Sequence, residues 1–126
     1  MTRPAHYIPT VAVASGIAYL SLIRETGLSL PHFTGWDKLA HFCMYFALAA
    51  VMLWDTRRDR KQGRTVSVVL LAVCCLYGGL IEILQEECCY PRTGDWLDWL
   101  ADCLGAVVGL YSMSMVWKHL KKDATC

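Results

Sequence analysis

Ionisable side chains interrupt the apolar stretches of this sequence at three places. His41 lies within one stretch, and Glu82 lies near the end of the next. Asp98 and Asp102 follow at the beginning of the last stretch, about one helical turn apart. An imidazole beside carboxylates can accept and donate protons, which is the chemistry of general acid–base catalysis. These four residues are therefore the candidate catalytic residues.

Further polar side chains accompany them. A helix places the polar residues between positions 37 and 45 within about 100° of arc. Lys38 and Arg92 supply positive charge for an anionic ligand. The candidate ligand-binding residues are Asp37, Lys38, Tyr45, Gln85 and Arg92. The charges could instead form ion pairs that lock the helix ends.

A divalent metal ion is an alternative occupant of the same layer. Carboxylates with one imidazole suit Mg²⁺, Mn²⁺ or Zn²⁺. The sequence contains no H-x-x-x-H pair that would support such a site locally. The sequence therefore leaves the metal content open.

Four long apolar stretches must position these residues. The hydrophobic fraction is 56%, and each stretch approaches the ~20 residues that a helix needs to cross a membrane. They are too long for membrane strands and lack two-residue alternation. We therefore predict an all-α, integral membrane bundle of four transmembrane helices in a single domain, residues 1–126. The predicted helices cover residues 8–23, 36–54, 66–84 and 96–117.

The basic residues predict an orientation. Nine of the twelve Lys and Arg residues flank one side of the four-helix arrangement. The positive-inside rule places that side, with both termini and the middle loop, in the cytoplasm. The basic middle loop is a topology signal, and no nucleic-acid partner is expected. The nine residues are Arg3, Arg57, Arg58, Arg60, Lys61, Arg64, Lys118, Lys121 and Lys122.

The four candidate catalytic residues also share a depth. A helix rises ~1.5 Å per residue, so each of the four lies roughly 3–10 Å inside the outer boundary of the membrane. Gly105 and Gly109 form a G-x-x-x-G pair on the face that carries Asp98 and Asp102, and such pairs mark helix-packing faces. Gly78 shares a face with Glu82 and would let another helix approach. Together these features predict a shared polar cavity that opens outward.

Four motifs carry a resemblance to a known family. They are D-K-L-A-H-F-C-M-Y from Asp37, E-I-L-Q from Glu82, R-T-G-D-W-L-D from Arg92 and G-A-V-V-G from Gly105. Over residues 36–110 the chain resembles the VanZ-like family of small bacterial membrane proteins. Asp102 departs from the family pattern, which usually has asparagine there. The family name comes from low-level resistance to the glycopeptide antibiotic teicoplanin, so the resemblance implies a protein of the bacterial cytoplasmic membrane that acts at the cell envelope.

Three functions remain open. The first is a site that binds or processes an envelope lipid or its headgroup, with membrane lipids, a glycopeptide or an envelope precursor as partners. The second is a non-enzymatic membrane factor that acts through helix–helix partners, including an oligomer of itself. The third is a four-helix thiol oxidoreductase, suggested by the vicinal pair Cys88–Cys89.

Overall fold

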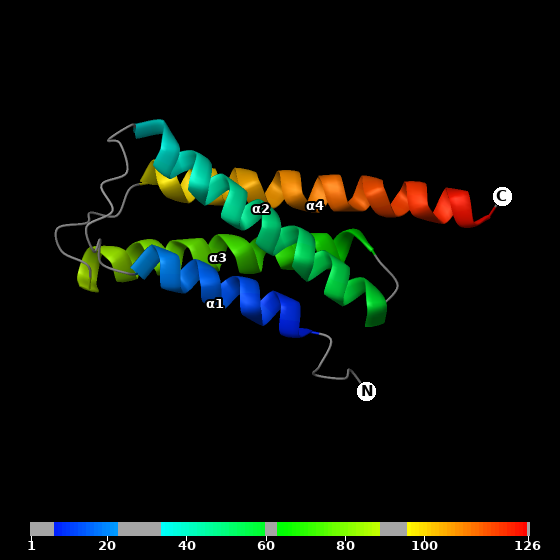
Figure 1. The fold of residues 1–126 in the computed structure, drawn as a ribbon, viewed down its shortest axis with the longest axis horizontal. Coiled ribbons are helices and arrows are strands. Elements are labelled where there is room, and N and C mark those ends of the chain that lie inside the picture. Colours follow the sequence, from blue (N-terminus) through cyan, green and yellow to red (C-terminus); the bar gives the residue numbers. More distant parts are fainter. Residues whose placement is uncertain (1–6, 23–33, 60–62, 89–95, 126) are drawn as a thin grey trace.

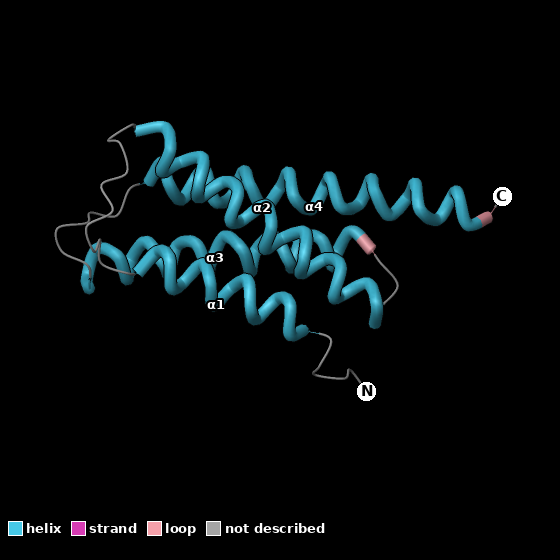
Figure 2. The backbone as a smooth tube through the Cα atoms, in the orientation of Figure 1, coloured by secondary structure: helices cyan, strands magenta, loops and turns pink. Residues whose placement is uncertain are grey.

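The structure is a computed structural model of the whole chain, and it describes residues 7–22, 34–59, 63–88 and 96–125. This part of the chain contains helices and no strand, which confirms the all-α prediction (Figures 1 and 2). The helices run alongside one another, and α4 extends beyond the others at its C-terminal end. They are α1 (Ile8–Leu22), α2 (Thr34–Asp59), α3 (Arg64–Cys88) and α4 (Trp96–Ala124).

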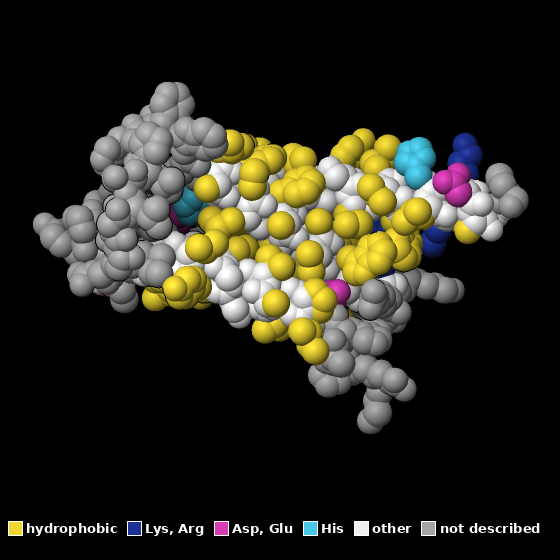
Figure 3. Space-filling view, viewed as in Figure 1, with side chains coloured by type: hydrophobic (Ala, Val, Ile, Leu, Met, Phe, Trp, Pro, Cys, Tyr) yellow, Lys and Arg dark blue, Asp and Glu magenta, His cyan; other side chains and the backbone are white. Residues whose placement is uncertain are grey.

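Three of these helices are long and apolar enough to cross a membrane: α2, α3 and α4. They extend beyond the predicted apolar stretches because charged residues end an apolar stretch without ending a helix. The shorter helix α1 is apolar over 15 residues. On the face drawn in Figure 3, apolar side chains cover the middle of the molecule, and charged side chains gather at the C-terminal end of α4. This distribution fits a helical bundle in a bilayer.

Helix α2 packs closely against α4 at two glycines. A Cβ atom at Gly105 would collide with the carbonyl oxygen of Phe42, and one at Gly109 would lie 2.5 Å from the carbonyl oxygen of Phe46. Only glycine permits backbones to approach this closely. The G-x-x-x-G face therefore packs inside the bundle, as the sequence predicts.

Helix α1 is attached to the bundle by polar contacts. Asp55 is 1% exposed, and its Oδ2 accepts hydrogen bonds from the backbone N–H of Thr10 at 3.2 Å and from Thr10 Oγ1 at 2.6 Å. The carboxylate of α2 thus satisfies a free N–H group in the first turn of α1. Farther along α1, Tyr77 Oη donates to the carbonyl of Ala14 at 2.5 Å.

Replacing Thr10 with valine is expected to lower the free energy of unfolding by about 1.5–3 kcal/mol, because a hydrogen bond to a buried carboxylate is lost. Thermal unfolding in mild detergent measures the change. The exposed Thr65 provides the matched control, and its replacement with valine should change stability by less than about 0.5 kcal/mol. An equal loss of stability in the Thr10 and Thr65 variants would contradict a role for Asp55 in attaching α1 to α2.

Candidate functional site

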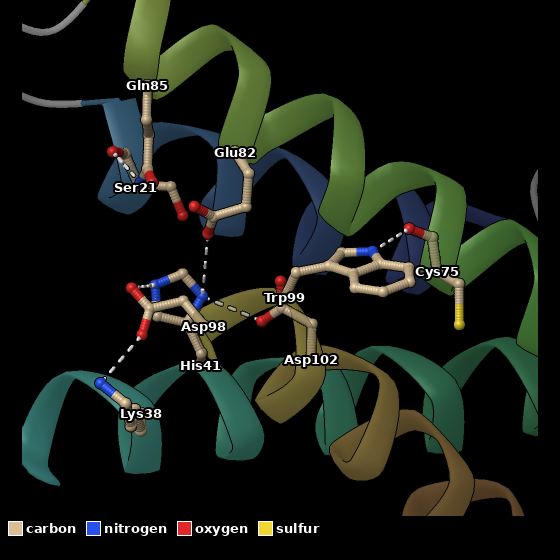
Figure 4. Close-up of polar contacts among 9 residues, drawn as sticks. All are labelled: Ser21, Lys38, His41, Cys75, Glu82, Gln85, Asp98, Trp99 and Asp102. Atoms are coloured by element: carbon tan, nitrogen blue, oxygen red, sulfur yellow. Dashed lines mark hydrogen bonds and ion pairs between the residues drawn. The ribbon is translucent and has the colours of Figure 1, made fainter. Parts of the chain in front are cut away.

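His41 of α2 lies at the centre of a buried polar cluster. Its Nδ1 lies 2.9 Å from Oδ1 of Asp102 on α4, within hydrogen-bond distance (Figure 4). His41 is 4% exposed and Asp102 is 0% exposed. A carboxylate in this position fixes the orientation of the ring and selects its tautomer.

Two more carboxylates flank the same ring. Oε1 of Glu82, on α3, lies 3.9 Å from His41 Nδ1. Oδ2 of Asp98, on α4, lies 3.8 Å from Nε2. Both ring nitrogens of His41, on α2, therefore face carboxylates, which α3 and α4 supply (Figure 4). The structure thus brings all four predicted catalytic residues into one cluster centred on the His41 ring; their catalytic role stays a prediction.

Lys38 forms the partly exposed edge of this cluster. Its Nζ lies 3.7 Å from Asp98 Oδ1, and its side chain is 35% exposed. Lys38 thus pairs with an acid of the cluster while part of the side chain stays accessible. This arrangement suits a cation that could also contact an anionic ligand.

Two other predicted ligand-binding residues lie deeper in the bundle. Tyr45 is fully buried in the core, and its Oη has no hydrogen-bond partner among the described residues. Gln85 donates from Nε2 to the carbonyl of Ser21 at 2.8 Å, so its amide ties α3 to α1 (Figure 4). The ligand-binding roles of both residues stay predictions.

For four residues singled out from the sequence, the structure does not describe the side chain. The structure describes neither the side chain of Asp37 nor that of Cys88, and it describes no part of Arg92 or Cys89. The role of Arg92 in binding an anionic ligand together with Lys38 therefore stays a prediction. The redox role of the vicinal cysteines also stays a prediction.

Gly78 gives Asp102 room beside α3. A Cβ atom at this position would lie 2.9 Å from Asp102 Oδ2. The missing side chain lets the aspartate approach α3, where Glu82 lies one helical turn farther along. The close approach predicted for the Gly78 face is therefore confirmed, and an aspartate occupies it.

A groove between α3 and α4 was not foreseen from the sequence. Its volume is about 500 Å³, and its lining is mainly apolar, with Leu76, Leu80, Ile83 and Trp96 among the lining residues. Glu82 also lines it. The indole of Trp99 forms part of the wall and donates from Nε1 to the carbonyl of Cys75 at 3.0 Å (Figure 4).

One sequence pattern is associated with this groove. Trp96 and Trp99 are three residues apart and share a helix face, and their rings meet edge to face at 5.7 Å between centroids. Gly79 of α3 also lines the groove, and a Cβ atom there would lie 3.5 Å from Trp99 Nε1. A pair of tryptophans opposite a glycine is a recognisable pattern, but only the packing of α3 on α4 shows that the pattern encloses a groove.

Comparison with known proteins gives one family. The VanZ/LLP1 family model matches residues 3–118. The uncharacterized protein C11E3.10 of Schizosaccharomyces pombe is 33% identical over 75 residues, which cover 59% of this chain and 44% of the yeast protein. The chain thus matches less than half the length of that relative. No solved structure matches the chain.

Proposed function

Because this chain belongs to the VanZ/LLP1 family and its helices are suited to a membrane, we propose that it binds and processes a membrane lipid with an anionic headgroup. The position of Glu82 carries the proposal. This residue lines the apolar α3–α4 groove and also lies 3.9 Å from His41 Nδ1. An acyl chain in the groove would thus bring its headgroup to the polar cluster.

The groove suits a lipid chain on physical grounds. Ligand pockets have volumes of roughly 300–1,000 Å³, and the groove holds about 500 Å³. It lies between two helices that can cross a membrane, so its surroundings are acyl chains rather than water. Similarity to a fungal protein also favours a ligand that is not confined to bacterial envelopes.

The polar cluster supplies groups for headgroup chemistry. Lys38 and Arg92 would hold the phosphate, since both are cations that the sequence places toward the outer side of the membrane. His41, oriented by Asp102, would accept a proton from an attacking water or hydroxyl and return it to the leaving oxygen. Glu82 and Asp98 would stabilise the charged imidazole that forms between these two transfers.

We also propose which side of the membrane the polar cluster faces. Lys118, Lys121 and Lys122 are exposed near the C-terminal end of α4, whereas Asp98 and Asp102 lie at its opposite end. With the basic end in the cytoplasm, both termini would lie inside and the cluster would face outward in the bacterial cytoplasmic membrane. A change in envelope lipids would then link the protein to glycopeptide resistance.

Filling the groove is expected to remove the bound lipid. Native mass spectrometry from mild detergent would compare the wild type with Gly79→Phe, whose ring occupies the groove beside Trp99. We expect a defined lipid mass in the wild type and a decrease of at least about tenfold in the variant, equivalent to about 1.4 kcal/mol. Gly16→Phe is the matched control, because no atom lies within 4 Å of a Cβ there.

A second variant separates lipid binding from lipid processing. His41→Gln should retain the lipid mass but lose turnover of phosphatidylglycerol supplied in vesicles, measured by mass spectrometry of the products. An equal lipid signal in the wild type and Gly79→Phe would rule out the groove as the binding site. Retained turnover in His41→Gln would rule out its role in proton transfer.

A non-enzymatic membrane factor is the second candidate. The G-x-x-x-G face of α4 is occupied by α2 and therefore unavailable to a partner. The face of α1 that carries Ala12 and Gly16 is exposed, and small residues allow another helix to pack closely there. Self-association that Gly16→Leu abolishes, with folding intact, would favour this candidate.

A further inference from the structure

We propose that His41, Glu82 and Asp102 bind one divalent metal ion. One ligand atom from each residue lies within 4.8 Å of the other two. All three residues are buried, and they come from three different helices. Tertiary packing alone thus brings together an imidazole nitrogen and two carboxylate oxygens, which are common ligands of Zn²⁺ and Mn²⁺.

The spacing of these atoms fits a shared ion. Ligands at about 2.1 Å from a tetrahedral centre are separated by roughly 3.4 Å. The distance from His41 Nδ1 is 2.9 Å to Asp102 Oδ1 and 3.9 Å to Glu82 Oε1. The observed separations bracket the expected one, so small side-chain movements suffice to bind the ion.

The surroundings of the imidazole provide a second, independent observation. A metal-bound histidine usually directs its other ring nitrogen at a carboxylate, which fixes the tautomer and raises the basicity of the ligand. His41 Nε2 faces Asp98 Oδ2 at 3.8 Å, and Asp98 in turn pairs with Lys38. The two nitrogens of His41 thus have the separate partners that such a site requires.

Asp102 also retains unused ligand capacity. It is 0% exposed, and its Oδ2 has no hydrogen-bond partner among the described residues. A buried carboxylate oxygen without a partner is costly, and a cation beside the carboxylate offsets that cost. The side chain points toward His41 and the cluster (Figure 4).

The charge of the cluster favours a divalent ion. Three buried carboxylates, those of Glu82, Asp98 and Asp102, surround an imidazole that must be neutral in order to ligate. A divalent ion at this position would add positive charge beside the carboxylates, as Lys38 does for Asp98.

This ion site does not depend on whether the groove binds a lipid. Metal binding and proton transfer are alternative uses of His41, because a ring that binds metal through Nδ1 and directs Nε2 at Asp98 has no nitrogen left to accept a proton. The test therefore measures the metal itself on the full chain in mild detergent. After removal of bound metal with a chelator, the protein is titrated with Zn²⁺ by calorimetry, and with Co²⁺ while its visible absorption is recorded. We expect one equivalent of metal per chain and a higher melting temperature with metal bound.

Variants test the identity of the ligands. Glu82→Gln and Asp102→Asn are each expected to weaken Zn²⁺ binding more than about tenfold and to change the Co²⁺ spectrum. Glu86→Gln is the matched control. Glu86 is exposed on α3 one turn beyond Glu82, so this change should leave binding unaltered.

Two results would overturn the proposal. One is a metal-free wild type that takes up no Zn²⁺ or Co²⁺. The other is equal affinity in the wild type, Glu82→Gln and Asp102→Asn. The Glu82 variant keeps the test decisive if Asp102→Asn fails to fold, because Glu82 lines the groove and does not lie between α2 and α4.

Discussion

Replacing His41 with leucine is expected to lower the free energy of unfolding by about 3–5 kcal/mol, the cost of removing one partner from a buried charge network. The imidazole touches three carboxylates: Asp102 at 2.9 Å, Asp98 at 3.8 Å and Glu82 at 3.9 Å. Leucine would leave the three acids buried beside one another. Their repulsion would then be offset by Lys38 alone among the described side chains.

Unfolding in mixed micelles, followed by circular dichroism, measures this change. His119→Leu is the matched control, because His119 is exposed near the C-terminal end of α4 and should tolerate the change within about 0.5 kcal/mol. A double variant that also carries Asp102→Leu should be less destabilised than the sum of the single variants, by about 0.5–3 kcal/mol. Strict additivity would show that the two side chains act independently.

Replacing Gly105 with alanine is expected to cost at least about 1–3 kcal/mol, the usual range for an overpacked contact. The added methyl group would collide with the carbonyl oxygen of Phe42. Because that atom belongs to the backbone of α2, no side-chain rotation relieves the overlap, and the two helices must separate. Separation would also move His41 of α2 away from Asp102 of α4.

The matched control for Gly105 is Gly16→Ala. Nothing lies within 4 Å of a Cβ at Gly16, and alanine favours a helix more than glycine does. Thermal unfolding of both variants in the same detergent gives the comparison. If Gly105→Ala were as stable as Gly16→Ala, this result would contradict the close backbone contact between α2 and α4 at Gly105.

Helix periodicity and hydropathy, both readable in the sequence, determined much of this architecture. Apolar stretches of suitable length predict the helices, and a rise of ~1.5 Å per residue predicts that His41, Glu82, Asp98 and Asp102 share a layer. The G-x-x-x-G pair indicates which face of the last helix turns inward. These properties are local, because each depends on the order of residues within one segment.

The tertiary structure decided the pairings. Periodicity gives the depth and face of a side chain, but the rotation and order of helices around the bundle depend on close packing between them. Glycine contacts bring α2 against α4, and this approach makes Asp102 the nearest carboxylate to His41. The same packing directs Gln85 to Ser21 and opens the groove beside Trp99. Such contacts join residues that are far apart in the chain, so a pattern within one helix could not predict them.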